Sequence, residues 1–173
     1  MKLTFPGGSL VLLVGPSGAG KSTFAKKYFK PTEILSSDYC RALVSDDEGD
    51  QSASRDAFEV LHLIAGKRLQ RGRLTVIDAT NVQANWRTSL LALAREHRAP
   101  AVAVVFNLGT NLCLDRNRLR VDRQVNPSII EKQEADLQRS LTELGTEGFR
   151  NVYVLGSADE IADVEIELQP LGS

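Results

Sequence analysis

Residues 9–23, SLVLLVGPSGAGKST, decide the fold of this chain. The run of five apolar residues at 10–14 predicts a strand buried on both faces, as in a parallel sheet covered by helices. The residues that follow it contain the spacing G-x-x-x-x-G-K-S, which is typical of the loop that cradles phosphates between such a strand and a helix. This order of strand, glycine-rich loop and helix predicts a nucleoside triphosphate site at the end of the strand.

The residues of this phosphate loop, 15–23, divide the work of binding phosphate. Gly15, Gly18 and Gly20 allow a tight turn that points backbone N–H groups inward, and the following helix N-terminus adds partial positive charge. We expect Lys21 to reach the β- and γ-phosphates, and the Ser22 hydroxyl to ligate Mg²⁺. The predicted nucleotide-binding residues of the loop are Gly15, Ser17, Gly18, Ala19, Gly20, Lys21, Ser22 and Thr23.

Further apolar segments alternate with helical patterns along the rest of the chain. Such alternation predicts an α/β fold, a P-loop phosphotransferase with a parallel sheet of about five strands flanked by helices. Asn126 and Pro127 are typical of the cap and first position of a helix. The predicted strands cover 9–15, 33–37, 74–79, 100–108 and 151–155, and the predicted helices cover 21–29, 54–70, 84–97, 112–121 and 127–144.

Length and composition indicate one ordinary globular domain over residues 1–173. The chain is 42% hydrophobic and has a net charge of −1, which excludes binding nucleic acid through overall charge but allows a local basic site. It has no signal-peptide pattern and no apolar stretch near the ~18 residues of a membrane span. With two well-separated cysteines, Cys40 and Cys113, we expect a cytoplasmic protein that does not bind membranes. The closing QPLGS (169–173) is typical of a domain edge.

A carboxylate ends the third predicted strand, within LTVIDATN (74–81). Asp78 has the position at which a carboxylate holds Mg²⁺ through water in nucleotide-binding folds of this type. In motor ATPases a glutamate commonly follows this aspartate and activates water, but Ala79 stands here. The pair therefore favours phosphate transfer to a bound acceptor over hydrolysis.

A second carboxylate follows the strand within ILSSDYCR (34–41). Asp38 lies just beyond the carboxyl end of that strand, where ligands gather in open α/β sheets, and can accept the proton of an acceptor hydroxyl. If a helical turn starts there, Arg41 shares its face and can hold an acceptor phosphate or the transferring group. The alternative is that Ser37 or Asp38 caps the helix, with Arg41 as an ion-pair partner.

Four arginines occupy RNRLRVDRQV (116–125). In one continuous helix, Arg116, Arg120 and Arg123 fall on one face, and Arg118 points to the other. We expect a helical lid whose arginines close over the triphosphate and balance charge during transfer, although a solvated helix face is the alternative. The acidic neighbours available to Arg118 are Asp115 and Asp122.

In combination, the phosphate loop, SSDYCR (36–41), LTVIDATNVQ (74–83) and the arginine-rich segment resemble the polynucleotide 5′-kinase family, and in particular the kinase module of bacterial polynucleotide kinase-phosphatases of RNA repair. This resemblance covers nearly the whole chain. It implies Mg²⁺-dependent transfer of the γ-phosphate of ATP or another NTP to a 5′-OH end of RNA or DNA. It also implies that Asp38 is the general base and that Arg41 contacts the acceptor end or the transferring phosphate. Gln51 touches the acceptor or has only a surface-loop role.

On the donor side, the resemblance implies that Lys21 and Ser22 bind phosphates and metal. Arg116 and Arg123 are implied to be lid arginines on the donor phosphates, and Arg120 to stack beneath the donor base. Family members also carry phosphatase and nucleotidyltransferase modules, so this chain is expected to be an excised kinase module or a stand-alone relative. Two alternatives stay open: a small-molecule kinase for a sugar, shikimate-like acid or nucleotide, and a non-catalytic nucleotide-binding module.

Overall fold

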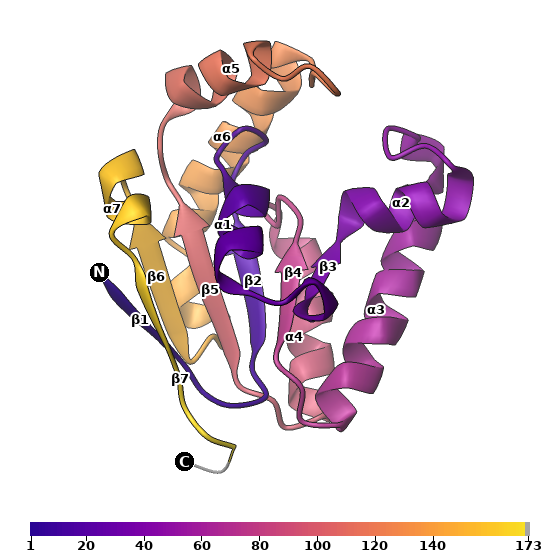
Figure 1. The fold of residues 1–173 in the computed structure, drawn as a ribbon, viewed down its shortest axis with the longest axis vertical. Helices are drawn as coiled ribbons and strands as arrows, with labels where there is room; N and C mark the ends of the chain where they lie inside the picture. The colour runs from indigo at the N-terminus through magenta and orange to yellow at the C-terminus, as the bar shows by residue number, and fades with distance from the viewer. Residues whose placement is uncertain (172–173) are drawn as a thin grey trace.

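A five-stranded parallel sheet forms the centre of the computed structural model, which describes residues 1–171 (Figure 1). The strand order is β3-β4-β2-β5-β6. The central strand, β2, is the apolar run that was predicted to be buried, and all five of its residues are buried. The sheet confirms the predicted α/β class. Its strands are β2 (Leu10–Val14), β3 (Ile34–Ser36), β4 (Thr75–Asp78), β5 (Ala101–Phe106) and β6 (Asn151–Leu155).

Helices cover both faces of this sheet, which explains why its strands are apolar on both sides. Leu10 and Leu12 belong to a core that includes residues of α3, α4 and α6, whereas Val11 and Leu13 belong to a second core with residues of α1. The alternation follows from the two-residue repeat of a strand. The helices are α1 (Lys21–Tyr28), α2 (Ser37–Ser45), α3 (Ser54–Gln70), α4 (Ala84–Glu96), α5 (Thr110–Arg118), α6 (Pro127–Leu141) and α7 (Ala158–Ala162), with 3₁₀ turns at Pro31–Glu33, Gln51–Ala53 and Leu144–Thr146. Among residues 1–171, no helix is long and apolar enough to cross a bilayer.

A second, two-stranded parallel sheet was not predicted. It pairs β1 (Lys2–Phe5) with β7 (Glu165–Leu168) and so joins the two ends of the domain. Both strands alternate polar and apolar residues, but each is only four residues long, and the acidic residues of β7 obscure the signal. Leu3 and Phe5 are fully buried, and the Phe5 ring stacks on Phe29 at 5.8 Å between centroids. Residues 172–173 of the expected domain edge lie outside the described residues.

Two predicted helices extend three residues beyond the ends that the structure has. The predicted helix 127–144 ends at Leu141, although it starts with the expected Asn126 cap. The predicted helix 112–121 is α5, which ends at Arg118 because the Asn117 side chain makes two bonds to the backbone of Val125, at 2.7 and 2.8 Å. These bonds fold the chain back on the last turn of α5, so residues 119–126 form a loop.

Candidate active site

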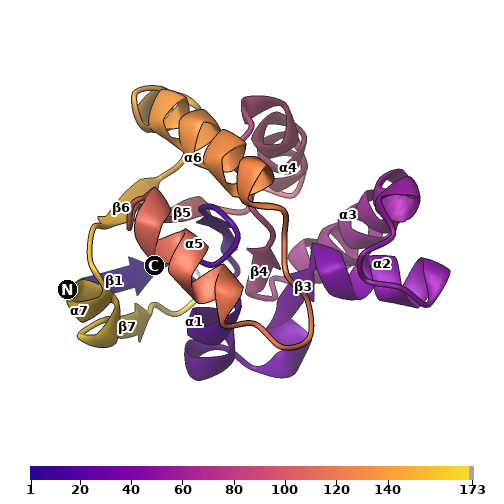
Figure 2. The same cartoon turned by 90° about the horizontal axis from the view of Figure 1, so that it is seen from above.

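A groove of about 1280 Å³ lies where the β2, β3 and β4 strands end. The phosphate loop forms its floor, the start of α2 and residues 47–51 form one wall, and the lid crosses it; we define the lid as α5 together with residues 119–126. Seen from above, the segment after α5 runs toward α2 before it turns into α6 (Figure 2), and its Arg123 contacts Asp38 of α2. All of the predicted loop residues from Ser17 to Thr23 line the groove.

The phosphate loop is tightly packed, so Gly18 cannot be replaced and Gly15 has little room for a side chain. Gly18 has φ +83°, and a Cβ there would lie 2.5 Å from the carbonyl oxygen of Cys113 in α5. A Cβ on Gly15 would lie 3.0 Å from the Cβ of Phe106. The backbone N–H of Ser17 donates to Gln133 Oε1 at 2.9 Å, so α6 also holds the loop. Gly15 thus packs against Phe106 of β5 and does not line the groove, whereas residues 17–23 do.

The Lys21 amine lies in a position that suits the binding of an anion. Its side chain is buried, with 7% of the residue exposed, and Nζ donates to the carbonyl of Pro16 at 2.7 Å. Burial lowers the pKa of this amine to about 8, although the nearby Asp78 carboxylate opposes the shift. A phosphate group at this position would favour the charged amine, because an opposite charge stabilises it.

Ser22 and Asp78 form the pair that fits a magnesium ion. Ser22 Oγ donates to Asp78 Oδ2 at 2.8 Å, and both residues line the groove. Burial raises the pKa of Asp78, and Lys21 opposes that shift. In nucleotide sites Mg²⁺ takes few protein oxygens and completes its octahedron with phosphates and water. Within residues 1–171 no cluster of three or more His, Cys, Asp or Glu side chains forms a separate metal site.

Asp38 lies in the first turn of α2 and faces the groove. The helix cap is neither Ser37 nor Asp38 but Ser36, whose Oγ accepts from the N–H of Tyr39 at 3.2 Å. The Asp38 carboxylate is thus not used as a cap. Its Oδ1 accepts from Arg41, as the ion-pair alternative expected. The side chain remains 42% exposed, so a ligand can still reach it.

Arg123 connects the lid to this wall of the groove. Its Nη1 lies 3.1 Å from Asp38 Oδ2 and 3.4 Å from the Glu48 carbonyl oxygen. The same carbonyl accepts from Arg41 Nε at 2.8 Å. The prediction that Arg123 continues a helical stripe is therefore wrong, because α5 ends before it and the residue reaches the groove from a loop. In this structure Arg123 lies against the carboxylate of Asp38.

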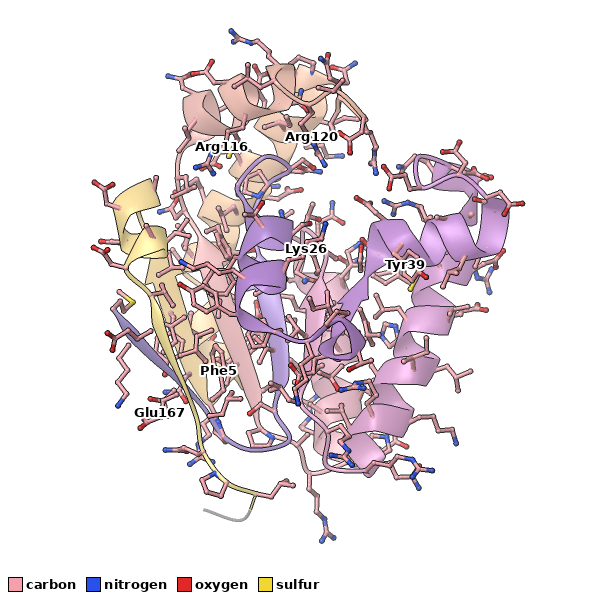
Figure 3. The ribbon with its side chains drawn as sticks, viewed as in Figure 1. Phe5, Lys26, Tyr39, Arg116, Arg120 and Glu167 are labelled. Atoms are coloured by element: carbon pink, nitrogen blue, oxygen red, sulfur yellow. The ribbon has the colours of Figure 1, made fainter. Side chains whose placement is uncertain are left out.

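Of the other lid arginines, Arg116 and Arg120 face the groove and Arg118 faces away from it, as expected. Arg116 Nη1 donates to the carbonyl of Ala19 at 3.3 Å, and Arg120 lines the groove although it follows the end of α5. Figure 3 shows both side chains between the lid and the phosphate loop. Arg118 is 72% exposed and lies 3.5 Å from the Asp115 carboxylate, away from the groove-lining residues.

Gln133, Phe58 and Trp86 line the groove but could not be identified from the sequence. Gln133 contacts the phosphate loop from α6, and a lone glutamine in a helix carries no distinguishing signal. Phe58 and Trp86 line the groove from α3 and α4, where aromatic residues would ordinarily be assigned to the core. Gln51, for which an acceptor contact or a surface-loop role is expected, also lines the groove.

A comparison with known families identifies the family of this chain. Residues 10–144 match the model of a family described as an AAA domain. The chain belongs to this AAA-domain family. The matched region contains the phosphate loop, Asp38, Asp78 and the lid, whereas the part of the groove lined by Ala158, Ile161 and Ala162 lies beyond it. No curated protein sequence matches the chain.

Solved structures show that this AAA domain has a P-loop kinase-like fold. A chain of the Pnkp1/Rnl/Hen1 RNA repair complex superposes with a TM-score of 0.69 and 24% identity, covering 82% of this chain and 47% of that one. A putative kinase from Chloroflexus aurantiacus has a TM-score of 0.61 and 17% identity, covering 86% and 84%. A gluconokinase from Sinorhizobium meliloti has a TM-score of 0.57 and 19% identity, covering 93% and 88%. At these identities the likeness concerns the fold.

Proposed function

We propose that this domain is a polynucleotide 5′-hydroxyl kinase, which transfers the γ-phosphate of ATP or another NTP to a 5′-OH end of RNA or DNA. The observation that carries the proposal is the position of Asp38, a partly exposed carboxylate in the same groove as Lys21 and the lid arginines. A kinase needs such a carboxylate to accept the proton of the attacking hydroxyl.

The chemistry divides between the two sides of the groove. The acceptor hydroxyl gives its proton to Asp38 as its oxygen bonds the γ-phosphorus, and the bond to the β-phosphate oxygen breaks. Asp38 has lone pairs left for this hydroxyl, because a carboxylate offers about four acceptor positions and the arginines use two. Lys21 and Arg116 would balance charge on the donor phosphates. Mg²⁺, held by Ser22 and through water by Asp78, would supply further charge neutralisation.

One observation favours a polynucleotide as the acceptor. It is the likeness to a chain of an RNA repair complex, and this chain covers 47% of that chain's length. We therefore also propose that the domain acts as one module beside phosphatase and nucleotidyltransferase modules, in the cytoplasm.

The second candidate is a small-molecule kinase. The observation that favours it is the gluconokinase, which matches this chain over almost the full length of both proteins. Incubation with γ-labelled ATP and Mg²⁺ separates the two candidates, with 5′-OH RNA, 5′-OH DNA, gluconate, shikimate and nucleoside monophosphates as acceptors. We expect label on the oligonucleotides. Label on a small molecule alone would refute the proposal.

The Asp38→Asn variant tests the assignment of the base in the same assay. The amide keeps the size of the side chain but cannot take the proton, so transfer should fall by about 10²–10⁴-fold. ATP binding, measured by calorimetry, should persist, because the base acts on the acceptor. Transfer at the parental rate would show that Asp38 is not the base.

A further inference from the structure

Two stacked aromatic rings lie in the wall of the groove. Phe58 of α3 and Trp86 of α4 stack with centroids 4.3 Å apart and an angle of 17° between the ring planes. Both line the same groove as Asp38, and Trp86 remains 37% exposed. Core aromatics are ordinarily covered on all sides, so a stacked pair that borders a groove is available to a ligand.

Neighbouring side chains link the two helices that carry this pair. The His62 ring lies 6.5 Å from the Phe58 ring, its Nδ1 is 2.9 Å from the Phe58 carbonyl oxygen, and its Nε2 is 3.2 Å from Ser89 Oγ. Ser89 in turn donates to the carbonyl of Trp86 at 2.9 Å. The two helices are thereby tied together behind the rings, so little ordering remains to be done when a ligand stacks on them.

The start of α2 and residues 47–51 form one wall of the groove, which we call the acceptor wall. The charges around it indicate what kind of ligand fits there. Asp38, Asp47 and Glu48 line it together with two cations, Arg41 and Arg123. Both arginines are already paired with Asp38. A small acid such as a sugar acid needs an unpaired cation, and this wall offers none among those five residues. An uncharged, flat group suits it better, and a 5′-OH end presents one because its first nucleoside carries no 5′-phosphate.

We infer that Phe58 and Trp86 form a stacking platform for the terminal nucleobase of the acceptor. The inference rests on the proposed function and deepens it, because it names the part of the polynucleotide that the groove recognises. Every base has a flat π-face, so a platform of this kind accepts any base. The terminal base is thereby held while its 5′-hydroxyl reaches Asp38.

Trp86 is the single tryptophan of the chain and reports on its own environment through its fluorescence. Titration without ATP uses a 5′-OH trinucleotide and the same molecule with an abasic sugar at its 5′ end. We expect saturable quenching of the tryptophan emission by the first and little by the second. In the kinase assay the abasic acceptor should still be phosphorylated, with a raised KM.

Variants separate stacking from folding. A stacked base contributes ~1–3 kcal/mol, and ~1.4 kcal/mol is a factor of ten, so Trp86→Leu should raise the acceptor KM by about 5- to 150-fold. Its kcat and its KM for ATP should stay near the parental values, and Phe58→Leu should act in the same direction. Trp86→Phe keeps a ring and should recover most of the affinity. Tyr39→Leu is the matched control, because Tyr39 is 63% exposed and lies outside the groove.

The outcomes distinguish this inference from the proposed function. If oligonucleotides are phosphorylated but the abasic acceptor has the same KM and Trp86→Leu changes nothing, the platform is refuted and the kinase assignment stands. If no oligonucleotide is phosphorylated and only a small acid quenches the emission, both are refuted. A raised acceptor KM in Trp86→Leu, with rescue by Trp86→Phe and a melting temperature like the parent's, supports the platform.

Discussion

Replacing Arg116 by alanine is expected to lower the rate of phosphoryl transfer by about 10³-fold or more, whereas Arg118→Ala should leave it nearly unchanged. The two residues are two positions apart in α5 and have the same chemistry. Each substitution removes one positive charge and has the same effect on helix propensity, so any difference between them reports where the guanidinium lies.

The structure sets the two magnitudes. Arg116 donates to the carbonyl of Ala19 within the phosphate loop, and its Nη1 would lie 3.2 Å from a Cβ on Gly20. An arginine at the donor phosphates can be worth ~10³–10⁵ in rate, which is about 4–7 kcal/mol of transition-state stabilisation. Arg118 makes a 3.5 Å ion pair with Asp115, and the two side chains are 72% and 64% exposed. Such a pair contributes about 0–1 kcal/mol to stability and nothing to transfer.

Single-turnover measurement of label transfer at saturating ATP gives the decisive comparison. Melting temperatures of both variants near that of the parent would show that neither substitution unfolds the domain. Equal losses of rate in the two variants would indicate a diffuse basic surface. A larger loss in Arg118→Ala would refute the orientation of α5 over the phosphate loop.

Three further predictions follow from buried or crowded positions. Because the pKa of Lys21 is about 8 and phosphates favour the charged amine, the affinity for ATP should be constant below that pH and fall above it. Binding above this pH should take up a proton, which calorimetry in two buffers measures. Lys21→Arg should abolish both effects. Gly18→Ala should abolish nucleotide binding. Gly109→Ala, at a similar φ of +84° but with open space around it, should still bind nucleotide, at a cost of about 1–3 kcal/mol in stability. Arg87→Ala should lower the free energy of unfolding, measured in urea, by ~3–5 kcal/mol, because it leaves Glu147 without its partner at 2.6 Å; an unchanged midpoint would contradict this.

The phosphate loop could be predicted from the sequence because its determinants are local. A buried strand, glycines that a crowded turn requires, and a lysine and serine at fixed spacing all lie within residues 9–23. Asp38 was predicted from its position after a strand, since parallel strands bring their carboxyl ends to one edge of the sheet. These features depend on neighbours along the chain and on the fold class alone.

The end of α5 could not be predicted, because it depends on a contact between a side chain in the helix and backbone eight residues further along the chain. Periodicity places Arg116, Arg120 and Arg123 on one stripe, but Asn117 captures the backbone of Val125 and turns the chain away after Arg118. The arginines still reach the groove, by a route that helical spacing does not describe. The aromatic pair was missed for a related reason, since a sequence does not show which of its rings border a groove.

The β1–β7 ribbon affects how the domain forms during synthesis. The ribosome delivers Leu3 and Phe5 before most of this domain, and these side chains are fully buried in the finished domain. Their partner strand, Glu165–Leu168, is made about 10–30 s later at roughly 5–20 residues per second. Until then the nascent chain holds a strand with an unpaired edge. Amino-acid changes in this ribbon should therefore reduce the yield of folded protein in cells, while the molecules that do fold keep their activity.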